Sequence, residues 1–351
     1  MTEEQKKGLS PFRKFLIAFA LIIVVILGIT LFNYYLRYMG KSVTDNEKYL
    51  YIKTGSSFDD VYRTIREKEI VKDSIVFLWV AQNMDYPLAV KPGKYRLKEG
   101  MSNRVLINML KAGNQEEVSM RFRGYRLKED FVAYVSKQIE PDSASLIKLL
   151  DSTAFISKYG FNKDNVYAMF IPNTYNMYWN ISEDAFFKRM YDEYQKFWTK
   201  ERLDKAKGIG LDPIQVSTLA AIVDAEALHD KEMPTIAGLY LNRLRKGIKL
   251  QADPTVIYAN NDFTIRRVLN RHLTKDSPYN TYVYKGLPPG PIMMPSINAI
   301  DAVLNYETHN YIYMCAKEDF SGYHNFAVTV AEHQANARRF QQALNERNIK
   351  R

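Results

Sequence analysis

The stretch LDPIQVSTLAAIVDAE, residues 211–226, predicts a helix that ends on a buried carboxylate. Asp212 suits the N-cap and Pro213 the first helical position, which sets where the helix begins. Counting back from Glu226 by seven, four and three residues reaches large apolar residues: Leu219, Ile222 and Val223. Side chains at these spacings share one helix face, so the pattern places Glu226 on the buried side.

Burial makes Glu226 a candidate general acid. Desolvation disfavours the charged form of a carboxyl group and raises its pKa, which suits a group that holds and delivers a proton near neutral pH. Asp224, counted back in the same way, reaches only small residues, so we expect the two acids to face different surroundings. The competing interpretation is that Glu226 belongs to a buried structural salt bridge or hydrogen-bond network.

The composition is that of a folded protein with about two domains: 351 residues, 46% hydrophobic and 25% charged. A net charge of +10 fits nucleic acid, anionic lipid or an acidic polymer equally well, and no Arg/Lys run marks a nucleic-acid patch. The single cysteine, Cys315, excludes an internal disulfide and a metal site built from cysteines. The five histidines have no metal-ligand spacing, and phosphate-loop and dinucleotide motifs are absent from the sequence. We therefore expect neither a metal nor a cofactor.

The N-terminus predicts a single membrane-spanning helix. Residues 15–32 contain nothing more polar than Gly28 and Thr30, and eighteen helical residues span most of a hydrocarbon core of about 30 Å. A cleaved signal peptide is the alternative, but bulky residues stand where a small-residue cleavage site would be. Lysines and arginines are denser before the span than after it. The positive-inside rule then places residues 1–14 in the cytoplasm, an anchor at 15–35 in the inner membrane, and the rest of the chain on the outer, periplasmic face.

Beyond the anchor, the patterns predict an α+β protein in three parts. Residues 45–116 form a small α+β module, with strands near 48–53 and 94–97 and helices at 57–68, 74–83 and 102–112. Residues 117–205 open on a strand and then become mostly helical, without a chemical motif. Residues 206–351 form a larger α+β domain, in which a second helix at 233–246 follows the Glu226 helix.

The remainder of this larger domain supplies candidate site residues. Gln251 and Asp253 lie on a segment biased away from helix before Pro254, and residues 279–284 have the β-branched and aromatic content of a strand. A stiff proline-rich loop at 286–291, strands at 311–315 and 323–328, and a helix at 330–348 follow. Each candidate also has a structural explanation: Asp253 as a helix N-cap, Tyr282 as a packing residue and His324 as a satisfied core histidine.

Five strings of this sequence, in order, resemble the endolytic murein transglycosylase family, the MltG/YceG-like proteins. They are residues 222–226, 241–244, 250–258, 279–282 and 286–292, and residues 91–113 resemble the LysM-like module of that family. Glu226 matches the family's catalytic acid, and Asp224 stands where relatives often have a first glutamate. The chain departs from the family at residues 167–175, where Asn173 replaces a common aspartate and removes any acidic role there.

The resemblance implies cleavage of the bond between N-acetylmuramic acid (MurNAc) and N-acetylglucosamine (GlcNAc) inside nascent peptidoglycan strands, leaving a 1,6-anhydroMurNAc end. Glu226 would be acid and then base, and six polar groups would position the sugar or hold Glu226: Gln251, Asp253, Tyr258, Asn280, Tyr282 and His324. The implied partners are glycan strands and membrane-bound peptidoglycan synthases. Two alternatives stay open: a water-using muramidase on the same scaffold, and a non-enzymatic peptidoglycan-binding scaffold for synthases.

Overall fold

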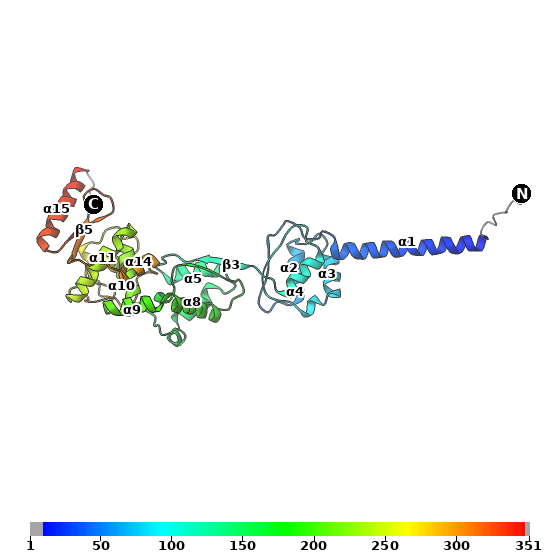
Figure 1. The fold of residues 1–351 in the computed structure, drawn as a ribbon, viewed down its shortest axis with the longest axis horizontal. Helices are drawn as coiled ribbons and strands as arrows, with labels where there is room; N and C mark the ends of the chain where they lie inside the picture. Colours follow the sequence, from blue (N-terminus) through cyan, green and yellow to red (C-terminus); the bar gives the residue numbers. More distant parts are fainter. Residues whose placement is uncertain (1–9, 348–351) are drawn as a thin grey trace. The chain divides into compact units, whose positions relative to one another are not determined.

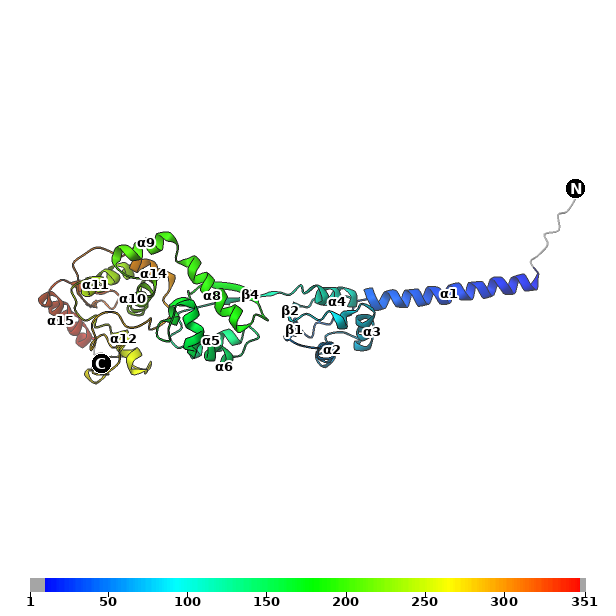
Figure 2. The ribbon, with the colours of Figure 1, turned by 90° about the horizontal axis from the view of Figure 1, so that it is seen from below.

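The computed structural model describes residues 10–347. The chain divides into two compact units: Met1–Val118 with Met177–Asn180, and Ser119–Asn176 with Ile181–Arg351 (Figures 1 and 2). Most of the predicted cytoplasmic segment, residues 1–9, and the end of the predicted last helix, Asn348, lie outside the described residues. We describe each unit by itself.

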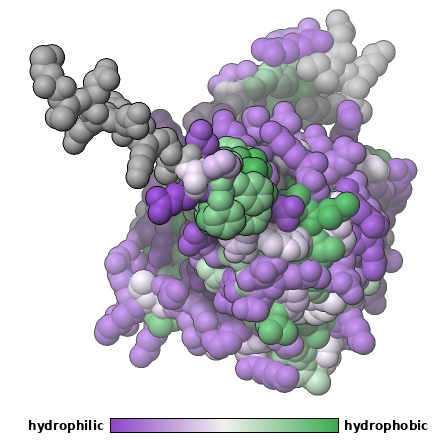
Figure 3. Space-filling model, turned by 90° about the vertical axis from the view of Figure 1, so that its right-hand side faces the viewer, coloured by the Kyte–Doolittle hydropathy of each residue, from purple (hydrophilic) through white to green (hydrophobic). Residues whose placement is uncertain are grey.

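The first unit begins with α1 (Pro11–Met39), which includes the whole of the predicted anchor. Ser10 caps the helix by accepting a hydrogen bond from the backbone of Arg13, and Pro11 occupies the first position. The apolar side chains of α1 are exposed, and Figure 3 views the molecule from the end where they lie (green). The helix is long and apolar enough to cross a membrane, which fits an anchor or a signal sequence.

The rest of the first unit is a small module of two strands and three helices. Its elements are β1 (Tyr49–Ile52), α2 (Phe58–Glu67), α3 (Ser74–Asn83), the 3-10 turn η1 (Tyr86–Leu88), β2 (Gly93–Arg96) and α4 (Asn103–Ala112). The two strands pair antiparallel, with Leu50 opposite Tyr95, and both side chains are buried in the module's core. A capping box at Ser57 and a left-handed Gly113 set helix limits close to those predicted.

The second unit opens with residues that pack around a cluster of aromatic rings. Its elements are β3 (Glu117–Arg121), α5 (Lys128–Ser136), α6 (Ser143–Asp151), α7 (Thr153–Ile156), the 3-10 turns η2 (Ser157–Tyr159) and η3 (Val166–Met169), β4 (Thr174–Tyr178), α8 (Glu183–Phe197) and α9 (Lys200–Ile209). β3 and β4 form a two-stranded sheet, and the boundary between the units passes through both strands. Phe131 lies 4.7 Å from Phe170 and 4.9 Å from Phe122, ring centre to ring centre.

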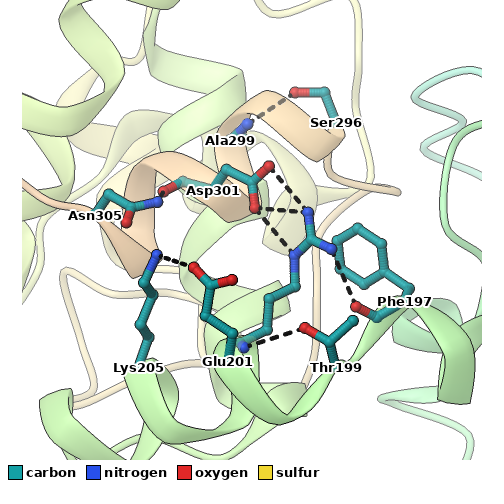
Figure 4. A network of polar contacts seen from close by, with 9 residues as sticks. Phe197, Thr199, Glu201, Lys205, Ser296, Ala299, Asp301 and Asn305 are labelled. Atoms are coloured by element: carbon teal, nitrogen blue, oxygen red, sulfur yellow. Dashed lines mark hydrogen bonds and ion pairs between the residues drawn. The ribbon is translucent and has the colours of Figure 1, made fainter.

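The rest of the second unit is built around a buried helix. Its elements are α10 (Pro213–Glu226), η4 (Asp230–Glu232), α11 (Met233–Arg245), α12 (Asp253–Asn260), α13 (Asn270–Leu273), α14 (Ile297–Leu304), β5 (Tyr313–Ala316), β6 (His324–Ala327) and α15 (Val330–Glu346). α10 packs against α9, α11, α12 and α14, and α15 packs on the β5–β6 hairpin. A bidentate pair between Arg202 and Asp301 ties α9 to α14 (Figure 4).

Two expectations need correction. α10 is buried on every side from Val216 to Val223, so its apolar residues do not form a stripe on one face. The small residues three, four and seven positions before Asp224 are as buried as the large residues at the same positions before Glu226. Residues 279–284 form turns instead of a strand, because the Asn280 side chain accepts the backbone N–H of Tyr282, the kind of local bond that competes with sheet pairing. Among the described residues the fold is mostly helical, with three two-stranded sheets.

Candidate functional site

Glu226 is the last residue of α10, at the point where this buried helix comes to the surface of a cavity. Asp212 and Gln215 form a capping box at the other end, and the chain turns extended at Ala227. Glu226 as a whole residue is partly exposed, although its carboxyl group is surrounded by protein, whereas Ile222 and Val223, the preceding turn, are fully buried. The C-terminal end of a helix carries a partial negative charge, which opposes ionisation of a carboxyl group placed there.

The surroundings of the Glu226 carboxyl raise its pKa to about 7, chiefly by burial. The negative charge of Asp253 acts in the same direction. Three groups oppose the rise: the Tyr240 hydroxyl, which donates a hydrogen bond of 2.9 Å to Oε1, the positive charge of His324, and the backbone N–H of Asp253. Desolvation outweighs these, so the carboxyl changes protonation state near neutral pH.

The carboxyl lines a cavity of about 330 Å³, which we call the Glu226 cavity. Its other lining residues come from α11, the segment before α12 and its first residue, the turns at residues 279–284, the β5–β6 hairpin and α15: Leu239, Tyr240, Arg243, Leu250, Gln251, Asp253, Tyr282, Tyr313, Met314, Cys315, Ala316, His324 and His333. The fold therefore brings four of the six predicted supporting residues together with Glu226: Gln251, Asp253, Tyr282 and His324.

Asp253 begins α12 and is held by Tyr282. The N-cap is Ala252, so the interpretation of Asp253 as an N-cap is wrong, although the first turn of a helix still favours its negative charge. The Tyr282 hydroxyl donates a hydrogen bond of 2.7 Å to Oδ1 of Asp253. Burial and this bond both raise the pKa of Tyr282, so its hydroxyl keeps its proton and remains a donor.

Gln251 is fixed by Arg243 of α11. Its backbone has a left-handed φ of 53°, unusual for a residue other than glycine, and its N–H donates to the carbonyl of Thr281. Arg243 donates to Oε1 of Gln251 and to the backbone carbonyls of Lys249 and Ile312. One buried guanidinium thus joins α11, the segment before α12 and the start of the hairpin on one side of the cavity.

His324 is oriented by a buried carboxylate. Glu232 accepts a 2.7 Å hydrogen bond from the backbone N–H of His324 and lies 2.8 Å from its ring Nδ1. Only 6% of the Glu232 residue surface is exposed. A carboxylate on one ring nitrogen fixes the orientation of an imidazole, and it leaves Nε2 as the nitrogen able to meet a ligand.

The other two predicted supporting residues lie outside the Glu226 cavity. Asn280 is fully buried, and its Nδ2 donates to the carbonyls of Leu273 and Lys275, so it shapes the loop that carries Tyr282. Tyr258 lies on α12 beyond Asp253 and lines a different cavity with Tyr279. Neither residue contacts Glu226 in the structure; their assignment to sugar binding stays a prediction.

Sequence reasoning missed several residues that line the Glu226 cavity, and also Glu232, which lies behind His324 and does not line the cavity itself. Tyr240, Arg243 and Glu232 carry the hydrogen bonds just described, while Tyr313 and His333 stack with ring centres 5.3 Å apart. Tyr240 and Arg243 are three residues apart on α11, so they share a face, and an arginine on a face otherwise packed into the core was a usable signal. Glu232 gave no such signal, because its partner lies 92 residues away. No cluster of three potential metal ligands occurs within residues 10–347.

Comparison of the chain with known protein families finds one family that matches most of it. The model of the YceG-like family matches residues 50–339. The chain belongs to the YceG-like family. This match includes every residue of the Glu226 cavity.

Related proteins carry the name endolytic murein transglycosylase. The chain is 26% identical to the protein of that name from Bacillus subtilis, over 84% of this chain and 85% of the relative. It is 25% identical to the one from Streptococcus pneumoniae strain D39, over 76% of this chain and 53% of the relative, so it spans about half of that longer protein. The crystal structure of a YceG-like protein from Listeria monocytogenes is similar in fold, with a TM-score of 0.55 and 23% identity over 82% of this chain and 97% of that one.

Proposed function

We propose that this protein is an endolytic lytic transglycosylase that cleaves MurNAc–GlcNAc bonds within nascent glycan strands and leaves 1,6-anhydroMurNAc ends. The observation that carries the proposal is the Glu226 carboxyl, with a pKa of about 7, at the wall of a polar cavity. A group with a pKa near the working pH is the most efficient single acid and base. Membership of a family whose relatives are named endolytic murein transglycosylases supplies the substrate class.

In this mechanism Glu226 acts twice. Protonated Glu226 donates its proton to the glycosidic oxygen as the bond from that oxygen to C1 of MurNAc breaks, which releases GlcNAc with a free hydroxyl. The C6 hydroxyl oxygen of the same MurNAc then bonds to C1, and the Glu226 carboxylate accepts the hydroxyl's proton. Water is not consumed, and the enzyme returns to its starting protonation state.

The neighbouring groups serve the charges that develop during these steps. The Tyr240 hydroxyl donates to Glu226 and so stabilises its carboxylate between the two proton transfers. Asp253, held by Tyr282, places a negative charge in the cavity, which favours positive charge developing on the sugar ring. His324, Gln251 and Tyr282 are the remaining polar groups proposed to position the sugar.

The muramidase alternative rests on Asp253, because a conventional glycosidase needs a second carboxyl to activate water or to attack the sugar. Digestion of uncross-linked glycan by the purified protein, followed by mass spectrometry of the new ends, separates the alternatives. Our proposal requires anhydro ends, which are lighter than reducing ends by one water molecule. Reducing ends would support the muramidase, and binding without cleavage would support a scaffold for synthases.

We further propose that α1 is an uncleaved anchor in the cytoplasmic membrane, with residues 1–14 inside and the chain beyond the anchor outside. The length and apolar surface of α1 support this. The module at residues 45–116 is proposed to be LysM-like, residues 117–205 to connect it to the catalytic domain at 206–351, and peptidoglycan synthases to be partners at the same membrane.

A further inference from the structure

A second cavity in the larger unit has no assigned role. It measures about 490 Å³ and shares no lining residue with the Glu226 cavity. Tyr167 comes from the segment between β3 and β4, whereas Tyr258 and Tyr279 come from α12 and the turn segment beyond it, so the cavity lies where the two halves of this unit meet. We call it the tyrosine cavity. Its size is in the usual range for sites that bind small molecules.

The wall of this cavity is fixed by close packing. The rings of Tyr258 and Tyr279 lie 4.7 Å apart at 50°, and the Tyr279 hydroxyl donates a hydrogen bond of 3.1 Å to the backbone carbonyl of Asp164. The proline-rich loop approaches the same carbonyl: a Cβ on Gly290 would lie 1.9 Å from it, so only glycine fits there. The cavity is therefore preformed.

Tyr167 contributes a polar group without a partner. It lines the tyrosine cavity and is 8% exposed, and its hydroxyl makes no hydrogen bond to any described residue. A buried hydroxyl left unpaired is costly, and such groups in native structures call for an explanation. A hydroxyl-rich or amide-rich ligand in the cavity would supply the missing partner.

The charges around the cavity favour a neutral ligand. Arg126 and Lys163 line it together with Glu129 and Asp164, so both signs are present. Lys128, the remaining cation of the lining, is paired with Asp151. A strongly charged ligand would meet repulsion from one pair or the other, whereas the hydroxyl and acetamido groups of a neutral saccharide accept from the cations and donate to the carboxylates. Tyrosine rings add apolar faces against which a sugar ring packs.

Two elements connect the tyrosine cavity to the Glu226 cavity. α12 contributes Asp253 to the Glu226 cavity and Tyr258 to the tyrosine cavity, and five residues of helix span about 7.5 Å. The turn segment at residues 279–284 contributes Tyr282 to the Glu226 cavity and Tyr279 to the tyrosine cavity. Asp253 and Tyr258 are five residues apart and lie about 140° apart around the helix axis, so a strand that occupies both cavities must pass around α12 instead of following one face of it.

We propose that the tyrosine cavity binds a neutral GlcNAc unit of the same glycan strand whose scissile bond lies at Glu226. The proposal rests on the proposed function and adds a second binding site to it. It predicts that strands long enough to reach both cavities bind more tightly than short ones, and that the difference depends on Tyr167 and Tyr258.

The test measures binding by the full chain in detergent, carrying Glu226→Gln to prevent cleavage. The probes are uncross-linked glycan strands stripped of stem peptides, a single disaccharide, and free stem peptide. Adding Tyr167→Phe removes one hydroxyl and is expected to weaken binding of long strands roughly fivefold, the value of one hydrogen bond. Tyr258→Leu, which removes a ring face, is expected to weaken it about tenfold. Disaccharide binding stays unchanged in both.

The matched control is Tyr86→Phe. Tyr86 is also buried and its hydroxyl also lacks a partner among the described residues, but it lies in the small module. This variant should bind all three probes as the parent does. Unchanged affinity of Tyr167→Phe for long strands would overturn the inference, as would an equal loss for the disaccharide or a loss confined to stem peptide. If the native chain still produces anhydro ends in that case, the proposed function stands without the tyrosine cavity.

Discussion

At the scale of the residue, the proposed chemistry depends on one carboxyl whose neighbours shift its pKa in opposite directions. Burial and Asp253 raise the pKa of Glu226, whereas the Tyr240 hydroxyl, His324 and the backbone N–H of Asp253 lower it. The outcome, a pKa of about 7, makes both protonation states accessible near neutral pH. Changing a single neighbour should therefore move the pH dependence of cleavage in a known direction.

Tyr240→Phe removes the hydrogen bond that stabilises the Glu226 carboxylate. The pKa of Glu226 should rise further above 7, so the fall in kcat/KM on the alkaline side, where the acid loses its proton, should move to higher pH. The measurement is the pH profile of kcat/KM on uncross-linked glycan. Tyr323→Phe, a ring stacked on His229 outside the Glu226 cavity, serves as the control and should leave the profile in place. A shift of the Tyr240→Phe profile to lower pH would contradict the assignment.

Glu226→Gln should abolish cleavage and stabilise the fold in alkaline solution. The folded state raises the pKa of Glu226 from 4.5 to about 7, so it binds this proton more tightly than the unfolded state does. The stabilisation that comes from the protonated carboxyl is present below pH 4.5 and is lost as the pH rises through 7. Glutamine does not titrate, so the variant should match the native protein near pH 4 and exceed it by on the order of 1–3 kcal/mol near pH 8.

Urea unfolding at the two pH values measures this difference. The control is Glu201→Gln, on an exposed residue of α9 that forms an ion pair with Lys205. A Glu226→Gln variant less stable than the native protein near pH 8 would show that Glu226 holds the fold together, as the structural salt-bridge interpretation requires.

At the scale of the element, the neighbouring acid Asp224 has a different function from Glu226. Asp224 accepts hydrogen bonds from the backbone N–H and the hydroxyl of Ser296, the N-cap of α14, and so joins the end of α10 to the start of α14. Burial raises the pKa of Asp224, and the two hydrogen bonds from Ser296 oppose the rise. The geometry assigns it to the scaffold and not to proton transfer.

Asp224→Ala should destabilise the second unit by about 2 kcal/mol, because two partly buried donors on Ser296 lose a charged acceptor. The free energy of unfolding from urea titration gives the value. Asp204→Ala, on an exposed residue paired with Lys200, should change it by less than about 0.5 kcal/mol. Equal values for the two variants would mean that the contact between Asp224 and Ser296 contributes little to the fold.

Most elements could be predicted from local sequence, because their ends carry strong signals. Asp212 with Pro213, Ser57 and Gly113 set helix limits that the structure reproduces within about one residue. The prediction of a strand at 279–284 was wrong, because the contacts that Asn280 makes with the preceding loop cannot be read from the residue types. Asn280 closes a local turn and is held by the carbonyls of Leu273 and Lys275, and the tyrosines around it line two cavities instead of pairing across a sheet.

The candidate site could be predicted only in part, for a similar reason. Glu226, Asp253 and His324 are polar residues in informative positions, and the strings that resemble the family include Glu226 and Asp253. Glu232 acts on His324 across 92 residues of sequence, and the hydrogen bond of Tyr240 depends on how α11 crosses α10. Long-range contacts of this kind leave no period or spacing in a single sequence.

At the scale of the whole molecule, the proposed anchor role of α1 would set where the chemistry happens. As an uncleaved anchor it would hold the rest of the chain at the membrane where new strands are made. This chain, expressed and purified from membranes, should then keep the mass of the expressed sequence, 40.8 kDa, less only N-terminal methionine processing. Intact-mass spectrometry measures this, and a mass that lacks the first 30 to 40 residues would identify α1 as a cleaved signal sequence instead.

The central claim is that a single carboxyl, Glu226, transfers both protons in a reaction that consumes no water. The most direct measurement digests uncross-linked glycan in H₂¹⁸O with the native chain and with Glu226→Gln, and determines the mass of every new end. We predict anhydroMurNAc ends free of ¹⁸O from the native chain and none from the variant. New ends that carry ¹⁸O, or anhydro ends produced at the native rate by Glu226→Gln, would contradict the account.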